Sequence, residues 1–176
     1  MPTERLTAEE YRRRYALGPK PKDEAELHRF FAHYVQKTYI GLPFYSTMDG
    51  ELGKARRGKM SVLKWPKRGW LDFLNFQPVG PYNGLVIELK MEGVRLQLQS
   101  DQKKAPITGY KKYRGKNYPI RANRRRKAGE WASEYIENQA IMIDHFRSWG
   151  WCANFVLGLE NAIAVFDGYM TQDLEL

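Results

Sequence analysis

Cysteine and histidine are scarce in this chain of 176 residues, which has one Cys and three His. The single thiol, Cys152, excludes a disulfide within the chain, and the apolar run after Gly150 favours a buried structural thiol over a nucleophile. His28, His33 and His145 fall in predicted helices, and their spacing matches no zinc motif and no triad with an obvious partner. Thiol, zinc and serine-hydrolase chemistry therefore find little support.

Long hydrophobic runs are also missing. No stretch is long enough to cross a bilayer, and the opening residues Met-Pro-Thr-Glu-Arg lack the apolar segment of a secretion signal. The composition, 43% apolar and 14% aromatic, is that of a folded chain rather than a disordered one. We therefore expect a protein of the reducing cytoplasm with no membrane partner.

Acidic residues are absent from two segments in which cations gather. Residues 103–127 contain eleven Lys and Arg, and residues 52–71 contain seven. Without these eighteen, eleven cations face twenty acids, so the net charge of +9 comes from the two segments. Concentrated cations suit a polyanion, because neutralising phosphates releases condensed counterions; a solvated loop is the alternative. The predicted nucleic-acid contacts are Arg56, Arg57, Lys111, Lys112, Arg114, Lys116, Arg121, Arg124, Arg125, Arg126 and Lys127.

The length of the chain suits one domain with a substantial core. A charged appendage at 1–22 ends in prolines, the domain follows at 23–170, and a short tail occupies 171–176. A basic insertion at about 97–130 interrupts the domain and lacks helical periodicity. Its tyrosines alternate with cations, a composition suited to phosphate contact and base stacking. We expect the insertion to form a flexible or β-hairpin lid over the active edge.

Hydrophobic periodicity predicts the element order αβββαβα. The first helix follows Asp23, a suitable N-cap, and Glu26 three residues later completes a capping box. The expected elements are a helix from 24, strands at 41–47, 69–76 and 85–90, a helix at 131–149, a strand at 151–158 and a helix at about 159–170. This α/β pattern predicts a mixed sheet with helices on both faces.

Three charged residues interrupt two apolar runs that a turn rich in Pro, Gly and Asn, residues 77–84, joins into a hairpin. Alternation places Glu88 and Lys90 together on the face opposite the core face. Asp72 lies across from Glu88 in this hairpin, so two carboxylates and one ammonium gather where lone charges are unfavourable. A divalent cation would resolve that conflict, and oxygen ligands suit Mg²⁺ or Mn²⁺.

An Asp followed by Glu-x-Lys on adjoining strands resembles the PD-(D/E)xK nuclease superfamily. The run Gly84-Leu-Val-Ile-Glu-Leu-Lys, with the later Gln139 helix that ends at Gly150, resembles its VRR-NUC branch, common in phages and repair proteins. The resemblance covers residues 24–170 apart from the basic insertion and implies a restriction-endonuclease-like core. Leu71 stands where the family has a proline before the Asp. Because proline binds no metal, we expect a local change and retained chemistry.

The resemblance also implies a role for each site residue. The implied metal ligands are Asp72, Glu88, the Leu89 carbonyl oxygen and Glu24. Glu24 is preferred to Glu26 because it shares the packed stripe of the first helix, whereas Glu26 is explained by the capping box. Lys90 would orient the attacking water or stabilise transition-state charge, and Gln139 would position the phosphate. Whether one or two ions act stays open.

Together these expectations predict a metal-dependent endonuclease that hydrolyses DNA. The resemblance further implies selective cutting of Holliday junctions or other branched DNA by a homodimer, in a bacterium or a phage-infected cell. A flap or nonspecific endonuclease is the alternative within nucleases. A DNA-binding protein of the same fold with a lapsed active site is the alternative outside them. An RNA-binding protein of ribosomal type would explain the charge but leaves the paired carboxylates unexplained.

Overall fold

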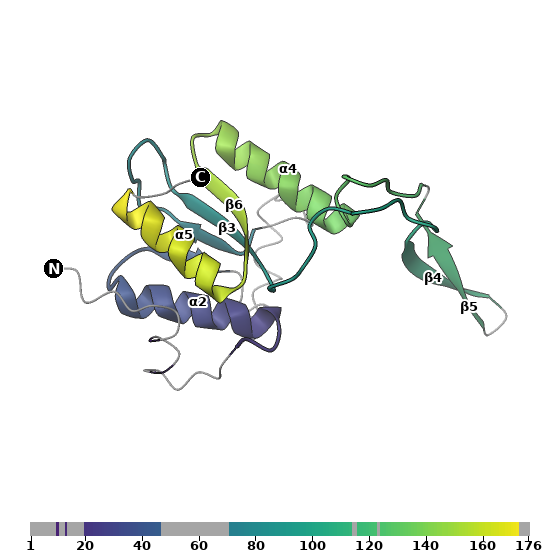
Figure 1. The fold of residues 1–176 in the computed structure, drawn as a ribbon, viewed down its shortest axis with the longest axis horizontal. Helices are drawn as coiled ribbons and strands as arrows, with labels where there is room; N and C mark the ends of the chain where they lie inside the picture. The colour runs from purple at the N-terminus through teal and green to yellow at the C-terminus, as the bar shows by residue number, and fades with distance from the viewer. Residues whose placement is uncertain are drawn as a thin grey trace. The chain divides into compact units, whose positions relative to one another are not determined.

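A computed structural model of the chain describes residues 10, 13, 20–46, 71–113, 116–122 and 124–172. Figure 1 shows the helices and strands of this part of the chain. The basic segment 52–71, apart from its last residue, lies outside the described residues. So do most of the predicted appendage at 1–22 and of the tail at 171–176.

The first long helix, α2, spans Glu24–Thr38 and begins at the predicted cap. The Asp23 side chain accepts a hydrogen bond from the backbone N–H of Glu26, at 2.8 Å. Glu26 in turn accepts from the backbone N–H of Lys22, at 2.7 Å, so the reciprocal bond of the capping box reaches one residue further back than expected. Leu27 and Phe31 are fully buried on the inner face of this helix. The cap thus fixes where the helix starts and which side chains it turns inward.

Four strands form the main sheet, in the order β1-β2-β3-β6. They are β1 (Phe44–Ser46), β2 (Phe73–Asn75), β3 (Leu85–Lys90) and β6 (Cys152–Leu157). β2 pairs antiparallel with both β1 and β3, whereas β3 pairs parallel with β6, which makes the sheet mixed. All six residues of β3 are buried, as expected for a parallel-paired strand covered on both faces.

Helices cover both faces of this sheet, as Figure 1 shows. α2 and α5 (Leu159–Thr171) pack on the face that carries Leu85, Ile87 and Leu89 of β3. The other face carries Val86, which packs with Ile143 of α4 (Glu134–Ser148). The predicted mixed sheet flanked by helices is confirmed. Tyr135 of α4 is 53% exposed and lies outside this core.

Gly84 sets the entry into β3. A Cβ atom at this position would lie 2.6 Å from the Asn75 carbonyl oxygen and 2.3 Å from the Trp151 ring. Only glycine lets β2, the turn and β6 approach so closely without a shift. The close approach holds the β2–β3 register, in which Phe73 pairs with Ile87.

Asp167 of α5 ties α2 to the rest of the core. Both of its carboxylate oxygens accept the Tyr34 hydroxyl at 2.8 Å, and Oδ1 also accepts the Tyr39 hydroxyl at 2.6 Å. Burial, followed by the hydrogen bond to Asp167, raises the pKa of Tyr34, so this hydroxyl stays a donor. The network anchors the helix whose first turns carry Glu24 and His28.

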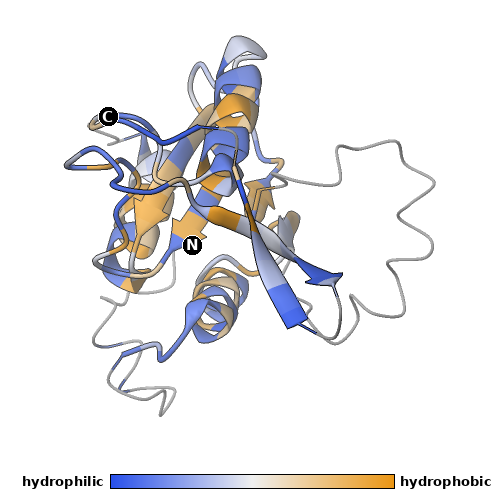
Figure 2. Cartoon of the chain, turned by 90° about the vertical axis from the view of Figure 1, so that its right-hand side faces the viewer, coloured by the Kyte–Doolittle hydropathy of each residue, from blue (hydrophilic) through white to orange (hydrophobic). Residues whose placement is uncertain are grey.

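Contacts divide the chain into two compact units, Met1–Val94 with Asn138–Leu176, and Arg95–Glu137. The second unit contains a two-stranded antiparallel hairpin of β4 (Ile107–Tyr113) and β5 (Lys116–Arg121). Nearly every residue of this hairpin is exposed. Figure 2 shows the contrast between the orange strands of the main sheet and the mostly blue and white hairpin. Among the described residues, no helix combines the length and the hydropathy that a membrane span needs.

Candidate active site

The two predicted carboxylates lie where β2 and β3 meet. Asp72 directly precedes β2, and the register that pairs Phe73 with Ile87 brings Asp72 opposite Glu88 when it is continued by one residue. Glu88 is fully buried and Asp72 is 9% exposed. Oδ2 of Asp72 accepts the backbone N–H of Leu89 at 3.0 Å, which fixes the carboxylate against β3. The Leu89 carbonyl oxygen as a metal ligand stays a prediction.

Lys90 lies two residues beyond Glu88, on the same face of β3. Its Nζ donates to Oε1 of Glu88 at 2.5 Å and to Oε1 of Glu24 at 2.9 Å. Burial on its own would lower the pKa of Lys90, but the charge of Glu88 and the bonds to both glutamates raise it. The side chain is therefore a buried ammonium that links β3 to the first turn of α2.

Gln139 reaches the same cluster from α4. It is fully buried, and its Nε2 donates a hydrogen bond to Oε1 of Glu88. Oε1 of Gln139 and Oε2 of Glu88 have no hydrogen-bond partner among the described residues. Two acceptor atoms thus stay unpaired in a buried site that already holds one ammonium.

The structure separates the two glutamates of the first helical turn. Glu26 is engaged at the helix cap, whereas Glu24 extends to Lys90. This placement brings Glu24 together with Lys90 and Glu88, and Glu24 as a metal ligand stays a prediction. Its side chain is half exposed, so it lies at the open side of the cluster.

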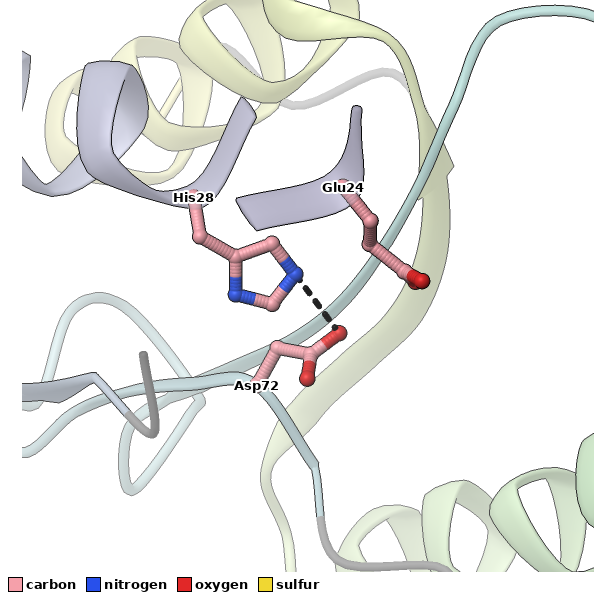
Figure 3. A group of neighbouring side chains, drawn as sticks. All are labelled: Glu24, His28 and Asp72. Atoms are coloured by element: carbon pink, nitrogen blue, oxygen red, sulfur yellow. Dashed lines mark ion pairs between the residues drawn. The ribbon is translucent and has the colours of Figure 1, made fainter. Parts of the chain in front are cut away.

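His28 is the residue that sequence reasoning missed. It lies one helical turn after Glu24, is only 2% exposed, and places Nε2 3.4 Å from Oδ2 of Asp72. Figure 3 shows Glu24 and His28 extending from α2, with an ion pair between the His28 ring and the Asp72 carboxylate. One ligand atom from each of the three residues lies within 4.8 Å of the others. The signal in the sequence was the spacing of four between Glu24 and His28, which puts both on one helix face.

The electrostatics of the cluster are unfavourable without a further cation. Burial, and then the nearby Asp72 carboxylate, raises the pKa of Glu88 from its ordinary value of 4.5 to about 9. Lys90 opposes this shift and offsets only part of it. A divalent cation would favour the charged form of Glu88 beside Asp72. It would also bind Oε2 of Glu88, the oxygen that has no hydrogen-bond partner among the described residues. The donor set of carboxylate oxygens and one imidazole therefore fits such an ion.

The predicted nucleic-acid contacts divide into three groups: residues outside the described ranges, exposed cations, and one buried cation, Arg126. Arg56, Arg57 and Arg114 lie outside the described residues. The exposed ones are Lys111, Lys112, Lys116 and Arg121 on the hairpin, with Arg124, Arg125 and Lys127 after it.

Arg126 is the exception among the described cations. It is 9% exposed, donates to Oε2 of Glu137 at 2.7 Å, and donates to the Trp131 carbonyl at 3.2 Å. Arg124 also has an acidic partner, Glu130, at 2.7 Å, but its side chain is 63% exposed. Arg126 thus holds the second unit together, and the exposed cations are the better candidates for phosphate contact.

Comparisons with known proteins add little to this picture. No protein-family model matches the sequence, and no curated protein matches it. The chain is similar to a solved structure described as "VRR_NUC domain protein", with 19% sequence identity and a TM-score of 0.48. The alignment covers 84% of this chain and 88% of that one. A likeness of this size does not establish an activity.

Proposed function

We propose that this protein is a divalent-metal-dependent endonuclease that hydrolyses phosphodiester bonds in DNA. The observation that carries the proposal is the buried cluster of Asp72, Glu88 and Lys90 on two paired strands. Paired buried carboxylates beside an ammonium disfavour the folded state unless they bind a ligand, and a hard divalent cation is the ligand they fit. Such clusters occur where chemistry requires shifted pKa values.

The site residues would divide the work as follows. Asp72 and Glu88, with Glu24, would hold Mg²⁺ or Mn²⁺. The bound cation would supply a water of lowered pKa and would offset charge on the phosphate oxygens. Lys90, kept protonated by its two glutamates, would orient the attacking water or stabilise charge that develops on the phosphate. Gln139 donates to one oxygen of Glu88 and so determines which oxygen is left for a ligand.

The proposal includes the DNA structure that is cut, the oligomeric state and the compartment. Cutting is selective for Holliday junctions or other branched DNA, and the protein acts as a homodimer in the cytoplasm of a bacterium or phage-infected cell. A two-fold dimer suits a symmetric junction, because resolution needs two symmetric cuts. The exposed cations of the β4–β5 hairpin supply the DNA contacts, and the tyrosines between them are suited to stacking on bases.

Leu71 is the feature that favours the alternative of a lapsed enzyme. It is 1% exposed and packs with Leu74 and Val86 in the core beneath α4. Its side chain therefore serves the packing of the sheet, and the neighbouring Asp72 still reaches the backbone of β3. The substitution leaves the carboxylate in place, so it gives the lapsed enzyme little support.

Cleavage of labelled DNA tests the proposal. A four-way junction, a flap and a plain duplex are each incubated with the protein in Mg²⁺, in Mn²⁺ and in EDTA. We expect paired symmetric nicks in the junction with either ion and none in EDTA, because hydrolysis needs the bound cation. Cutting of all three substrates would keep the catalytic assignment and refute structure selectivity. Binding without cutting in any metal would indicate the lapsed enzyme.

Charge reversal tests the DNA surface separately. The variant with Lys111→Glu and Lys112→Glu is expected to bind DNA more weakly. The slope of log affinity against log salt concentration should decrease in magnitude by about 1 to 2, since each lost phosphate contact removes close to one unit of slope. The measurement is fluorescence anisotropy of labelled duplex and junction in EDTA across a salt series.

The matched control reverses two exposed cations of α2, Arg29→Glu with Lys37→Glu, and so changes the net charge equally. We expect it to weaken binding less than the hairpin variant. Equal losses from both variants would show that net charge alone matters. An unchanged affinity of the hairpin variant would remove β4–β5 from the DNA surface.

A further inference from the structure

His28 is a buried imidazole whose ring lies beside the Asp72 carboxylate. Its side chain is 2% exposed, yet neither Nδ1 nor Nε2 has a hydrogen-bond partner among the described residues. Buried polar groups are nearly always paired, and an apolar residue at this place in α2 would avoid the cost of burial. An imidazole buried beside a carboxylate, with no hydrogen bond to either nitrogen in the described part of the chain, indicates a ligand.

The position of the ring shows what kind of ligand it faces. Nε2 points toward Oδ2 of Asp72, at 3.4 Å, and Glu24 lies on the same face of α2 one turn before it (Figure 3). These three side chains can each bring one ligand atom within 4.8 Å of the other two. An imidazole nitrogen beside two carboxylates is a metal-ligand set. Asp72 belongs both to this set and to the ligands assigned to the catalytic cation.

Glu88 is arranged differently from this trio. Its Oε1 already accepts from both Lys90 and Gln139. Oε2 of Glu88 has no hydrogen-bond partner in the part of the chain that the structure describes. A cation bound by Asp72 would therefore meet one oxygen of Glu88 from β3, and an imidazole nitrogen from α2. The site is then not built of oxygen ligands alone.

We propose that His28 is a direct ligand of the catalytic cation and makes the site select Mn²⁺ over Mg²⁺. Oxygen ligands suit both ions, but an imidazole nitrogen is a softer donor, and Mn²⁺ accepts it more readily than the harder Mg²⁺, which keeps oxygen ligands and several waters. The proposal rests on the proposed nuclease function only in calling the bound cation catalytic. The selectivity itself is a property of Glu24, His28 and Asp72.

Electron spin-echo envelope modulation of Mn²⁺ bound to the full chain tests direct ligation without DNA or activity. We expect a ¹⁴N coupling to the Mn²⁺ spin that changes when the protein is labelled with [¹⁵N]histidine. The same signal should vanish in His28→Asn and persist in His33→Asn, which alters another histidine of the same helix. A wild-type protein that binds Mn²⁺ without any histidine nitrogen coupling would overturn the proposal, whatever the variants do.

Calorimetric titration with Mn²⁺ alone and Mg²⁺ alone tests the selectivity. His28→Asn is expected to lose about tenfold or more in Mn²⁺ affinity and less than about threefold in Mg²⁺ affinity. His28→Asp, which makes the ligand set all oxygen, should bind Mg²⁺ at least as well as the wild-type protein. The selectivity claim would be overturned if His28→Asn lost affinity for Mn²⁺ and Mg²⁺ equally and His28→Asp also bound Mg²⁺ more weakly than the wild-type protein.

Failure of this inference can be told apart from failure of the nuclease assignment. Histidine-coupled Mn²⁺ in a protein that cuts no DNA would support the ligand and refute the nuclease. Metal-dependent cutting without nitrogen coupling would refute the ligand and support the nuclease.

Discussion

Glu88→Gln is expected to reduce the rate of metal-dependent DNA cleavage by about 10³-fold or more, while DNA affinity measured in EDTA stays within about threefold of wild type. The amide keeps the size of the side chain and still accepts from Gln139 and Lys90 through its oxygen. It removes the negative charge and the carboxylate oxygen offered to the cation. Single-turnover cleavage of the preferred substrate with excess protein measures the chemical step directly.

The matched control for this experiment is Glu92→Gln. Glu92 follows β3 by two residues, is exposed, and pairs with Lys20 at the surface. Surface pairs of this kind contribute little, so this variant should cleave like the wild-type protein. Full activity of Glu88→Gln would remove Glu88 from the metal site. Loss of activity together with loss of DNA affinity would instead indicate damage to the fold.

Local patterns in the sequence predicted most of what holds the site together. Asp23 and Glu26 mark the start of α2, and alternation along β3 separates Leu85, Ile87 and Leu89 from Glu88. The Pro, Gly and Asn content of residues 77–84 indicates the hairpin that brings Asp72 opposite Glu88. Each of these inferences depends on neighbours within about twenty residues, where spacing and turn chemistry decide the geometry.

What the sequence could not show depends on contacts between distant segments. His28 and Asp72 are 44 positions apart, and only the packing of α2 against β3 brings the imidazole to the carboxylate. Arg126 looked like one of several equivalent cations, but its contacts with Glu137 and Trp131 bury it. Tertiary packing determines which cation of a charged segment is buried. A count of cations in the sequence cannot distinguish that residue from its neighbours.

The stability of the metal-free protein is expected to fall as the pH rises from about 5 to about 9, and Glu88→Gln should remove most of that fall. The pKa of Glu88 is raised from 4.5 to about 9, chiefly by burial and then by Asp72. Between these values the folded protein keeps a proton that the unfolded chain has released. Raising the pH therefore favours unfolding, and the stability present below pH 4.5 is lost as the pH approaches the folded pKa.

Thermal unfolding in EDTA at a series of pH values, with wild type, Glu88→Gln and Glu92→Gln side by side, measures this effect. At pH 8 the Glu88→Gln protein should be the more stable by on the order of several kcal/mol, with a smaller difference at pH 5. Parallel curves for wild type and Glu88→Gln would show that Glu88 carries no such shift. Adding Mn²⁺ should raise the melting temperature of the wild-type protein more than that of Glu88→Gln, because a ligand stabilises only the state that binds it. Glu88 would then destabilise the metal-free protein and bind the ion that hydrolysis requires.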